Sequence, residues 1–92
     1  MRHFLVHDAK DNVGVAVVDI EAGQDATGAS IDSGATLTIT SLQPIPLGHK
    51  IALKDFKVGD TIIKYGEDIG RVVADIRAGG HVHVQNLKTK RW

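Results

Sequence analysis

Short apolar runs rich in β-branched residues alternate with polar, glycine-containing segments along most of this chain. Within 36–40 polar and apolar side chains alternate one by one, which is typical of a half-buried strand. Further runs that predict strands occupy 4–7, 13–18, 50–53, 61–65, 69–74 and 81–85. No long window keeps a helical apolar period free of glycine, so helix signals are weak. The pattern predicts an all-β fold of about seven or eight short strands.

Three connecting segments shape the predicted order of these strands. Residues 8–12 form a polar turn, which predicts a hairpin between the first two strands. Pro44 and Pro46 bracket Ile45 and lack backbone N–H donors, so we expect an extended connector there. Residues 20–34 are rich in Gly, Ala and Asp, and we expect them to be mainly loop, with a weak strand near 29–31.

One six-residue pattern occurs three times, at 19–24, 55–60 and 75–80. Each copy reads Asp, a large apolar residue, a charged residue, a small apolar residue, Gly, and then a polar residue or Gly. Because Gly reaches positive φ at little cost, the pattern predicts a tight chain reversal, with the large apolar residue anchored in the core. The alternative is turn chemistry that recurs by chance in a Gly-rich β protein. The spacing is uneven, which excludes a solenoid of constant period.

Length and composition limit the partners and compartments that suit this chain. Its 92 residues fit a single domain over 1–92, with a core built mainly from Val, Ile, Leu and Ala. Eleven basic residues balance eleven acidic ones, which argues against a nucleic-acid partner. The chain has no cysteine, no signal-peptide pattern and no run of membrane-spanning length. We therefore expect a cytoplasmic protein with no membrane partner and no thiol or disulfide chemistry.

Histidines are the main candidates for chemistry. His81 and His83 are two residues apart, so on a strand both side chains share one face while Val82 and Val84 point to the core. Two adjacent imidazoles can bind a divalent metal or a carboxylate, or transfer a proton. A surface strand that simply carries two histidines is about as frequent, and the pattern alone does not separate the two cases.

His49 strengthens the functional interpretation, because it stands between a glycine and Lys50 at the start of a predicted strand. An imidazole and an ammonium group are thereby placed side by side. Asn86, three residues after His83, adds an amide that can orient a hydroxylated substrate. His3 and His7 lie on the N-terminal strand, and we expect them to be ordinary surface or hairpin residues.

Several segments together resemble the SAF domain of the altronate and galactarate dehydratase family. They are 45–53, 58–60, 62–66, 69–70, 78–79 and 81–86, whereas residues 1–44 agree with the family only in pattern. The resemblance implies a small β-clip fold. One position departs from the family, because Gln85 stands where a third histidine is usual. Glutamine can still hydrogen-bond a hydroxyl or a carboxylate.

The resemblance also implies a lyase that performs β-elimination on a 2-hydroxy acid. A base removes the proton on C2, a group leaves from C3, and the resulting enol becomes a 2-keto acid. We expect sulfite to leave, converting sulfolactate to pyruvate, rather than water from a sugar acid such as altronate or galactarate. Because the chain ends soon after the last family segment, we expect a separate small subunit beside a large catalytic subunit, inactive on its own.

Roles for individual residues follow from the same resemblance. We expect catalysis from His49 and Lys50, substrate binding from Gln85 and Asn86, and metal ligation from His81 and His83. Lys50 would offset the negative charge of the substrate. The metal would be a divalent ion, Fe2+, held mainly by the large subunit. The alternative is a stand-alone SAF-type module that binds small hydroxylated or anionic ligands.

Overall fold

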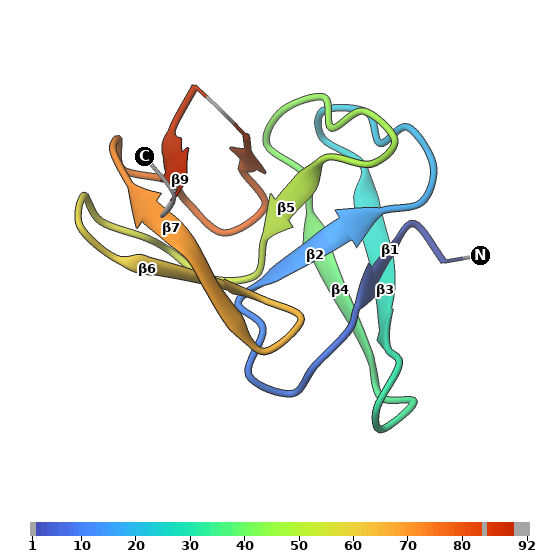
Figure 1. The fold of residues 1–92 in the computed structure, drawn as a ribbon. Helices are drawn as coiled ribbons and strands as arrows, with labels where there is room; N and C mark the ends of the chain where they lie inside the picture. Colours follow the sequence, from blue (N-terminus) through green and yellow to red (C-terminus); the bar gives the residue numbers. More distant parts are fainter. Residues whose placement is uncertain (1, 84, 90–92) are drawn as a thin grey trace.

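The computed structural model describes residues 2–83 and 85–89, and the chain is built from strands (Figure 1). Nine strands occur in these residues: β1 (Phe4–Val6), β2 (Val13–Ala16), β3 (Asp25–Ser30), β4 (Thr36–Thr40), β5 (Lys50–Ala52), β6 (Thr61–Lys64), β7 (Glu67–Val72), β8 (His81–Val82) and β9 (Leu87–Thr89). The described ranges hold no helix that is long and apolar enough to cross a membrane. The all-β prediction is confirmed; β3 is longer than the weak strand expected near 29–31, and β9 is additional.

The strands form two sheets. The larger sheet has the order β4-β3-β1-β2-β5-β8, and the smaller one has the order β6-β7-β9. Strands β1 and β2 pair antiparallel, as the predicted hairpin requires, whereas β1 and β3 pair parallel. In Figure 1 the smaller sheet lies on the left, and β1 to β4 lie on the right. Strands β5 and β8 therefore form the edge of the larger sheet that is nearer to the smaller one.

Strand β3 is longer than the weak strand expected near 29–31, while the rest of 20–34 lies outside strands as expected. Its buried residues are small, Ala26, Gly28 and Ala29, so it lacks the β-branched pattern that marks the other strands. Gly28 lies directly opposite Phe4 in the register between β3 and β1. A Cβ atom at Gly28 would lie 2.0 Å from Cε2 of Phe4, so the buried ring occupies the space that a side chain would need. The strand depends on this packing, which the local sequence does not reveal.

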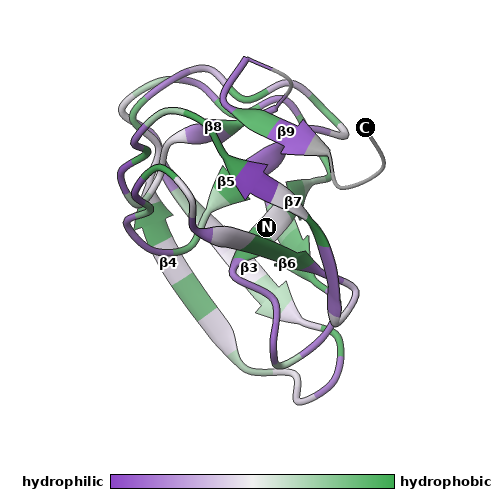
Figure 2. Cartoon of the chain, turned by 60° about the vertical axis from the view of Figure 1, so that its left-hand side comes forward, coloured by the Kyte–Doolittle hydropathy of each residue, from purple (hydrophilic) through white to green (hydrophobic). Residues whose placement is uncertain are grey.

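Buried apolar residues form two clusters. The first lies between the sheets and contains Val13, Ala52, Phe56, Ile62, Val72, Ile76, Val82 and Leu87. The second belongs to the larger sheet and its turns and contains Phe4, Val6, Ala16, Ile20, Ala26, Ile45 and Ile51. Green and pale bands alternate along β4 in Figure 2, and its Leu37 and Ile39 pack against the second cluster. The predicted alternation of this strand is therefore confirmed.

The chain reverses at four similar corners, one more than the sequence predicted. Three are the predicted copies at 19–24, 55–60 and 75–80, and the fourth is 44–49. The glycine at the fifth position of each corner has a φ between 81° and 95°. The anchor residues are all 5% exposed or less, as predicted for the three copies: Ile20, Ile45, Phe56 and Ile76.

Backbone hydrogen bonds join the corners into two pairs. In the first corner pair (19–24 with 44–49), Ile20 and Ile45 each donate an N–H to the carbonyl of the other, at 2.9 and 2.8 Å. Phe56 and Ile76 do the same in the second corner pair (55–60 with 75–80), at 2.7 and 3.0 Å. These bonds bring the loops at the ends of distant strands into contact.

Aspartate recurs in the pattern because its carboxylate accepts a hydrogen bond from the opposite corner of the pair. Three such bonds, of 2.8 to 2.9 Å, run from Leu47 N to Asp19 Oδ1, from Ala78 N to Asp55 Oδ1, and from Val58 N to Asp75 Oδ1. The second corner pair is therefore bonded in both directions, whereas the first is bonded in only one. Each bond satisfies a backbone donor in a tight turn.

Candidate functional site

Three histidines meet where β5 and β8 begin and end. His49 closes the corner that precedes β5, His81 opens β8, and His83 follows β8. The two strands pair antiparallel with Lys50 opposite Val82. One step further along this register brings His49 opposite His83. The strand pairing thus explains how residues far apart in sequence converge.

The three rings are in close contact. His49 and His83 stack with their centroids 3.8 Å apart and their planes at 16°. His49 Nδ1 lies 2.7 Å from His81 Nε2, within hydrogen-bonding distance. One nitrogen from each ring falls within 4.8 Å of the other two. Val82 is fully buried while both neighbouring histidines are partly exposed, as predicted, and the expectation for Val84 lies outside the described residues.

Gln85 contacts the ring of His81. Its side-chain nitrogen lies 3.1 Å from His81 Nδ1. When this amide donates to Nδ1, a neutral His81 carries its proton on Nε2 and donates it to His49 Nδ1. A neutral His49 then carries its own proton on Nε2. Gln85 can in this way set the tautomers of two histidines.

Asn86 is engaged with the backbone of the same segment. Its Oδ1 accepts from the His83 N–H at 3.0 Å, and its Nδ2 donates to the His81 carbonyl at 2.7 Å. Gln43, which the sequence analysis did not single out, accepts from the His81 N–H at 2.9 Å. No local pattern identifies it, because the contact spans 38 residues. These side chains hold the backbone that presents the histidines.

Burial and positive neighbours disfavour the charged forms of His81 and His83. Burial is the main cause that lowers the pKa of His81, and the charges of His49, His83 and Lys50 lower it further. Burial likewise lowers the pKa of His83, with His49 and Lys50 as further causes. In the described part of the chain, the buried Nδ1 of His83 has no hydrogen-bond partner. Its lone pair or proton is therefore available for another group.

Lys50 lies near the histidines without joining their face of the sheet. It stands directly opposite Val82, and directly opposed residues of antiparallel strands point to the same side. Burial and then the nearby charge of Lys64 lower the pKa of Lys50. Its influence on His81 and His83 is electrostatic.

His3 and His7 take part in other contacts. The Thr27 N–H donates to His3 Nδ1 at 2.9 Å, which links β3 to the start of the chain. The ring of His7 packs on Tyr65 with the centroids 4.1 Å apart. Both histidines serve the N-terminal hairpin and its neighbours.

Known proteins that resemble this chain place it in one family. The family model of the altronate/galactarate dehydratase SAF domain matches residues 2–90. The chain belongs to this family. It is 56% identical over 90 residues to "(2R)-sulfolactate sulfo-lyase subunit alpha" of Chromohalobacter salexigens, which covers 97% of this chain and 96% of the relative. A protein of the same name from Paracoccus pantotrophus is 61% identical over 54 residues, covering 59% of this chain and 81% of the relative.

SAF domains of this family also occur within longer proteins. Altronate dehydratase of Escherichia coli is 44% identical over 89 residues, which make up 97% of this chain but only 17% of that enzyme. The same domain therefore exists both in chains of about this length and as a small share of a much larger polypeptide.

The three histidines of this SAF domain suit a divalent transition metal. Imidazole nitrogens are good ligands for Fe, Ni, Cu and Zn ions. The lowered pKa values of His81 and His83 favour the neutral imidazoles that bind metals, and Nδ1 of His83 has no hydrogen-bond partner that would compete with a metal. Within the described residues this is the one group of three or more metal-binding side chains in mutual reach. His49, expected to be catalytic, thus joins the two expected ligands.

The corner that carries His49 was missed because it lacks the opening aspartate. It reads Pro, Ile, Pro, Leu, Gly, His over 44–49 and keeps the buried apolar anchor, the apolar fourth residue and the glycine. A search for these three positions, without the aspartate, finds it. Such a search would have placed His49 at a chain reversal.

Proposed function

We propose that this chain is the small subunit of a two-subunit lyase that eliminates sulfite from sulfolactate to give pyruvate. The observation that carries this proposal is the 56% identity, over 97% of the chain, to a protein named (2R)-sulfolactate sulfo-lyase subunit alpha. The word subunit in that name supports a second chain. The altronate dehydratase in which this domain makes up 17% supports a much larger one.

The reaction needs a base, stabilisation of negative charge and a leaving group. A base removes the proton on C2, the C3–S bond breaks with its electron pair on sulfite, and the enol takes a proton at C3 to become pyruvate. Loss of the C2 proton places negative charge next to the substrate carboxylate. Cations and fixed hydrogen-bond donors stabilise that charge most effectively.

The histidine cluster would supply hydrogen-bond donors. With the tautomers set by Gln85, His49 carries a proton on Nε2 and can donate to a carboxylate or sulfonate. Lys50 would add positive charge. A divalent ion, Fe2+ by family resemblance, would be held by His83 and by His81, which would give up its hydrogen bond to His49, with further ligands from the larger subunit. When bound, it would stabilise the charge that develops on the substrate carboxylate.

The test is reconstitution with the larger subunit from the same cells. The purified complex is expected to release sulfite from sulfolactate, whereas the 92-residue chain alone is expected to be inactive with ferrous ion present. If the complex instead forms a 2-keto-3-deoxy sugar acid from altronate or galactarate and releases no sulfite, the reaction is dehydration and not elimination of sulfite. Robust turnover by the chain alone would contradict the role of a subunit.

Single substitutions test the site within this complex. His49→Ala and His83→Ala are each expected to lower turnover by about 100-fold or more, which corresponds to about 2.7 kcal/mol of transition-state stabilisation. His3→Ala, outside the cluster, is the matched control and should retain activity. Gel filtration checks that each variant still assembles. Unchanged turnover in both cluster variants would show that the histidine cluster has only a structural role.

A further inference from the structure

The first corner pair has one hydrogen bond fewer than the second. Proline stands at 44, where each of the other three corners has an aspartate. Asp19 still accepts from the Leu47 N–H, but Pro44 has no carboxylate for the equivalent N–H of Ala22. Across residues 2–83 and 85–89 no hydrogen bond uses the Ala22 N–H. A backbone donor is therefore left free at this corner.

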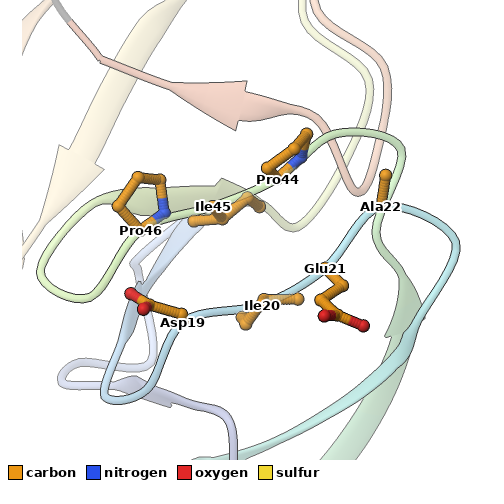
Figure 3. A pocket seen from close by; sticks show the side chains of 7 residues that line it. All are labelled: Asp19, Ile20, Glu21, Ala22, Pro44, Ile45 and Pro46. Atoms are coloured by element: carbon orange, nitrogen blue, oxygen red, sulfur yellow. The ribbon is translucent and has the colours of Figure 1, made fainter.

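An open cleft of about 590 Å³ lies at the same place. Its lining residues are Asp19, Ile20, Glu21, Ala22, Pro44, Ile45 and Pro46 (Figure 3). The two prolines have no N–H of their own, and the N–H groups of Ile20 and Ile45 bond to each other's carbonyls. The cleft thus combines apolar walls, one unused N–H and two carboxylates.

Three exposed apolar residues lie within two residues of the cleft lining in the sequence. Leu42 is 50% exposed, Leu47 is 61% exposed and Val17 is 38% exposed. Large apolar side chains that gather around a cleft mark surfaces that other proteins cover. The same corner ends at His49, which belongs to the histidine cluster.

We propose that this surface, defined by the cleft together with Val17, Leu42 and Leu47, is the docking surface for the larger subunit. The inference rests on the proposed function, since it names where that subunit binds. In an altronate dehydratase the matching domain is 17% of one polypeptide, so there it is joined to a much larger stretch of chain. A partner seated on this corner would also lie next to His49.

The chemistry of the cleft selects the segment that fills it. The Ala22 N–H can donate to a partner, but a carboxylate is disfavoured as the acceptor because Asp19 and Glu21 already line the cleft. A main-chain carbonyl in an extended apolar segment is a hydrogen-bond acceptor that carries no net charge, so it suits this cleft. A Lys or Arg of the same segment would pair with the two carboxylates. The larger subunit therefore offers an apolar strand-like segment flanked by a basic residue.

Two equivalent positions give a matched pair of variants. Leu47 and Val58 are the fourth residues of their corners, 61% and 64% exposed, but only Leu47 lies in the first corner pair. Leu47→Ser is expected to weaken the binding of the larger subunit about tenfold or more, whereas Val58→Ser should change it less than about twofold. Circular dichroism confirms that both variants remain folded. Binding is measured by titrating purified larger subunit into fluorescently labelled chain.

Pro44→Asp tests the unused donor itself. The new carboxylate is expected to accept the Ala22 N–H and slow its hydrogen exchange about fivefold in the free chain. By filling the cleft and adding a third negative charge, it should also weaken binding of the larger subunit about tenfold or more. In the wild-type complex, the Ala22 amide should become protected when the larger subunit binds.

The outcomes separate this inference from the proposed function. If the wild-type chain binds the larger subunit but Leu47→Ser and Pro44→Asp bind equally well, the docking surface is refuted while the assembly stands. Unchanged exchange at Ala22 on binding would refute it too. If the wild-type chain does not bind the larger subunit at all, the proposed function fails and this inference fails with it.

Discussion

Asn86 offers a sharp test of how the histidine segment is held. Its side chain accepts from the His83 N–H and donates to the His81 carbonyl, at 3.0 and 2.7 Å, and both bonds are partly buried. Asn86→Ala removes both partners at once. A hydrogen bond of this kind contributes about 1 kcal/mol net, so the two together predict a loss of about 2 kcal/mol in the free energy of unfolding.

Urea unfolding of the isolated chain, followed by far-UV circular dichroism, measures this loss. The transition midpoint should fall at an unchanged slope, and the melting temperature should fall by about 10 °C. Gln85→Ala is the neighbouring control and should stay within about 0.5 kcal/mol, because Gln85 is exposed and contacts one ring. Stability of Asn86→Ala within about 0.5 kcal/mol of wild type would refute the clamp. A raised KM in the reconstituted enzyme would then favour the substrate-binding role instead.

Further predictions concern the core and the histidines. Gly28→Ala should destabilise the chain by at least about 2 kcal/mol in urea unfolding, and adding Phe4→Leu should recover part of this loss; additive losses would contradict the packing argument. Val82→Asp should abolish the folded circular dichroism spectrum, because it buries a charge without a partner, and a folded variant would contradict this. The metal-free chain should lose stability as the pH falls through 6.5. In the unfolded chain His81 and His83 gain protons near that pH, whereas in the folded chain their pKa values are lowered, so protons bind preferentially to the unfolded chain. Urea midpoints against pH check this, and a flat profile between pH 7.5 and about 5 would contradict it.

Sequence patterns predicted the strands that follow local rules. β-Branched alternation identified β4, and the repeated aspartate and glycine identified three corners with their buried anchors. The sequence predicted only the end of strand β3, because its small residues are specified by the Phe4 ring on the neighbouring strand. The fourth corner escaped because proline replaces the aspartate at 44. Both failures occur where long-range packing, and not local propensity, determines the structure.

The candidate site was predicted only in part, because some of its contacts also depend on long-range packing. Alternation alone placed His81 and His83 on one face, because that relation lies within one segment. The stacking of His49 on His83 depends on the register between β5 and β8, which a single sequence does not contain. Asn86 was expected to bind a substrate, yet its side-chain amide bonds to the backbone of His81 and His83. An amide in a turn serves the backbone as readily as a ligand.

The charges around the cluster have one sign. The groups that lower the pKa of His81 by their charge are His49, His83 and Lys50, and no carboxylate joins the three-histidine group within the described residues. Such a site disfavours protons and favours anions, and sulfolactate carries both a carboxylate and a sulfonate. An anion bound there would oppose the positive neighbours and raise the histidine pKa values toward their ordinary range. This SAF domain thus suits the donor-bearing half of an active site, and oxygen ligands would have to come from elsewhere. That division fits a domain that is nearly a whole subunit in one relative and 17% of a polypeptide in another.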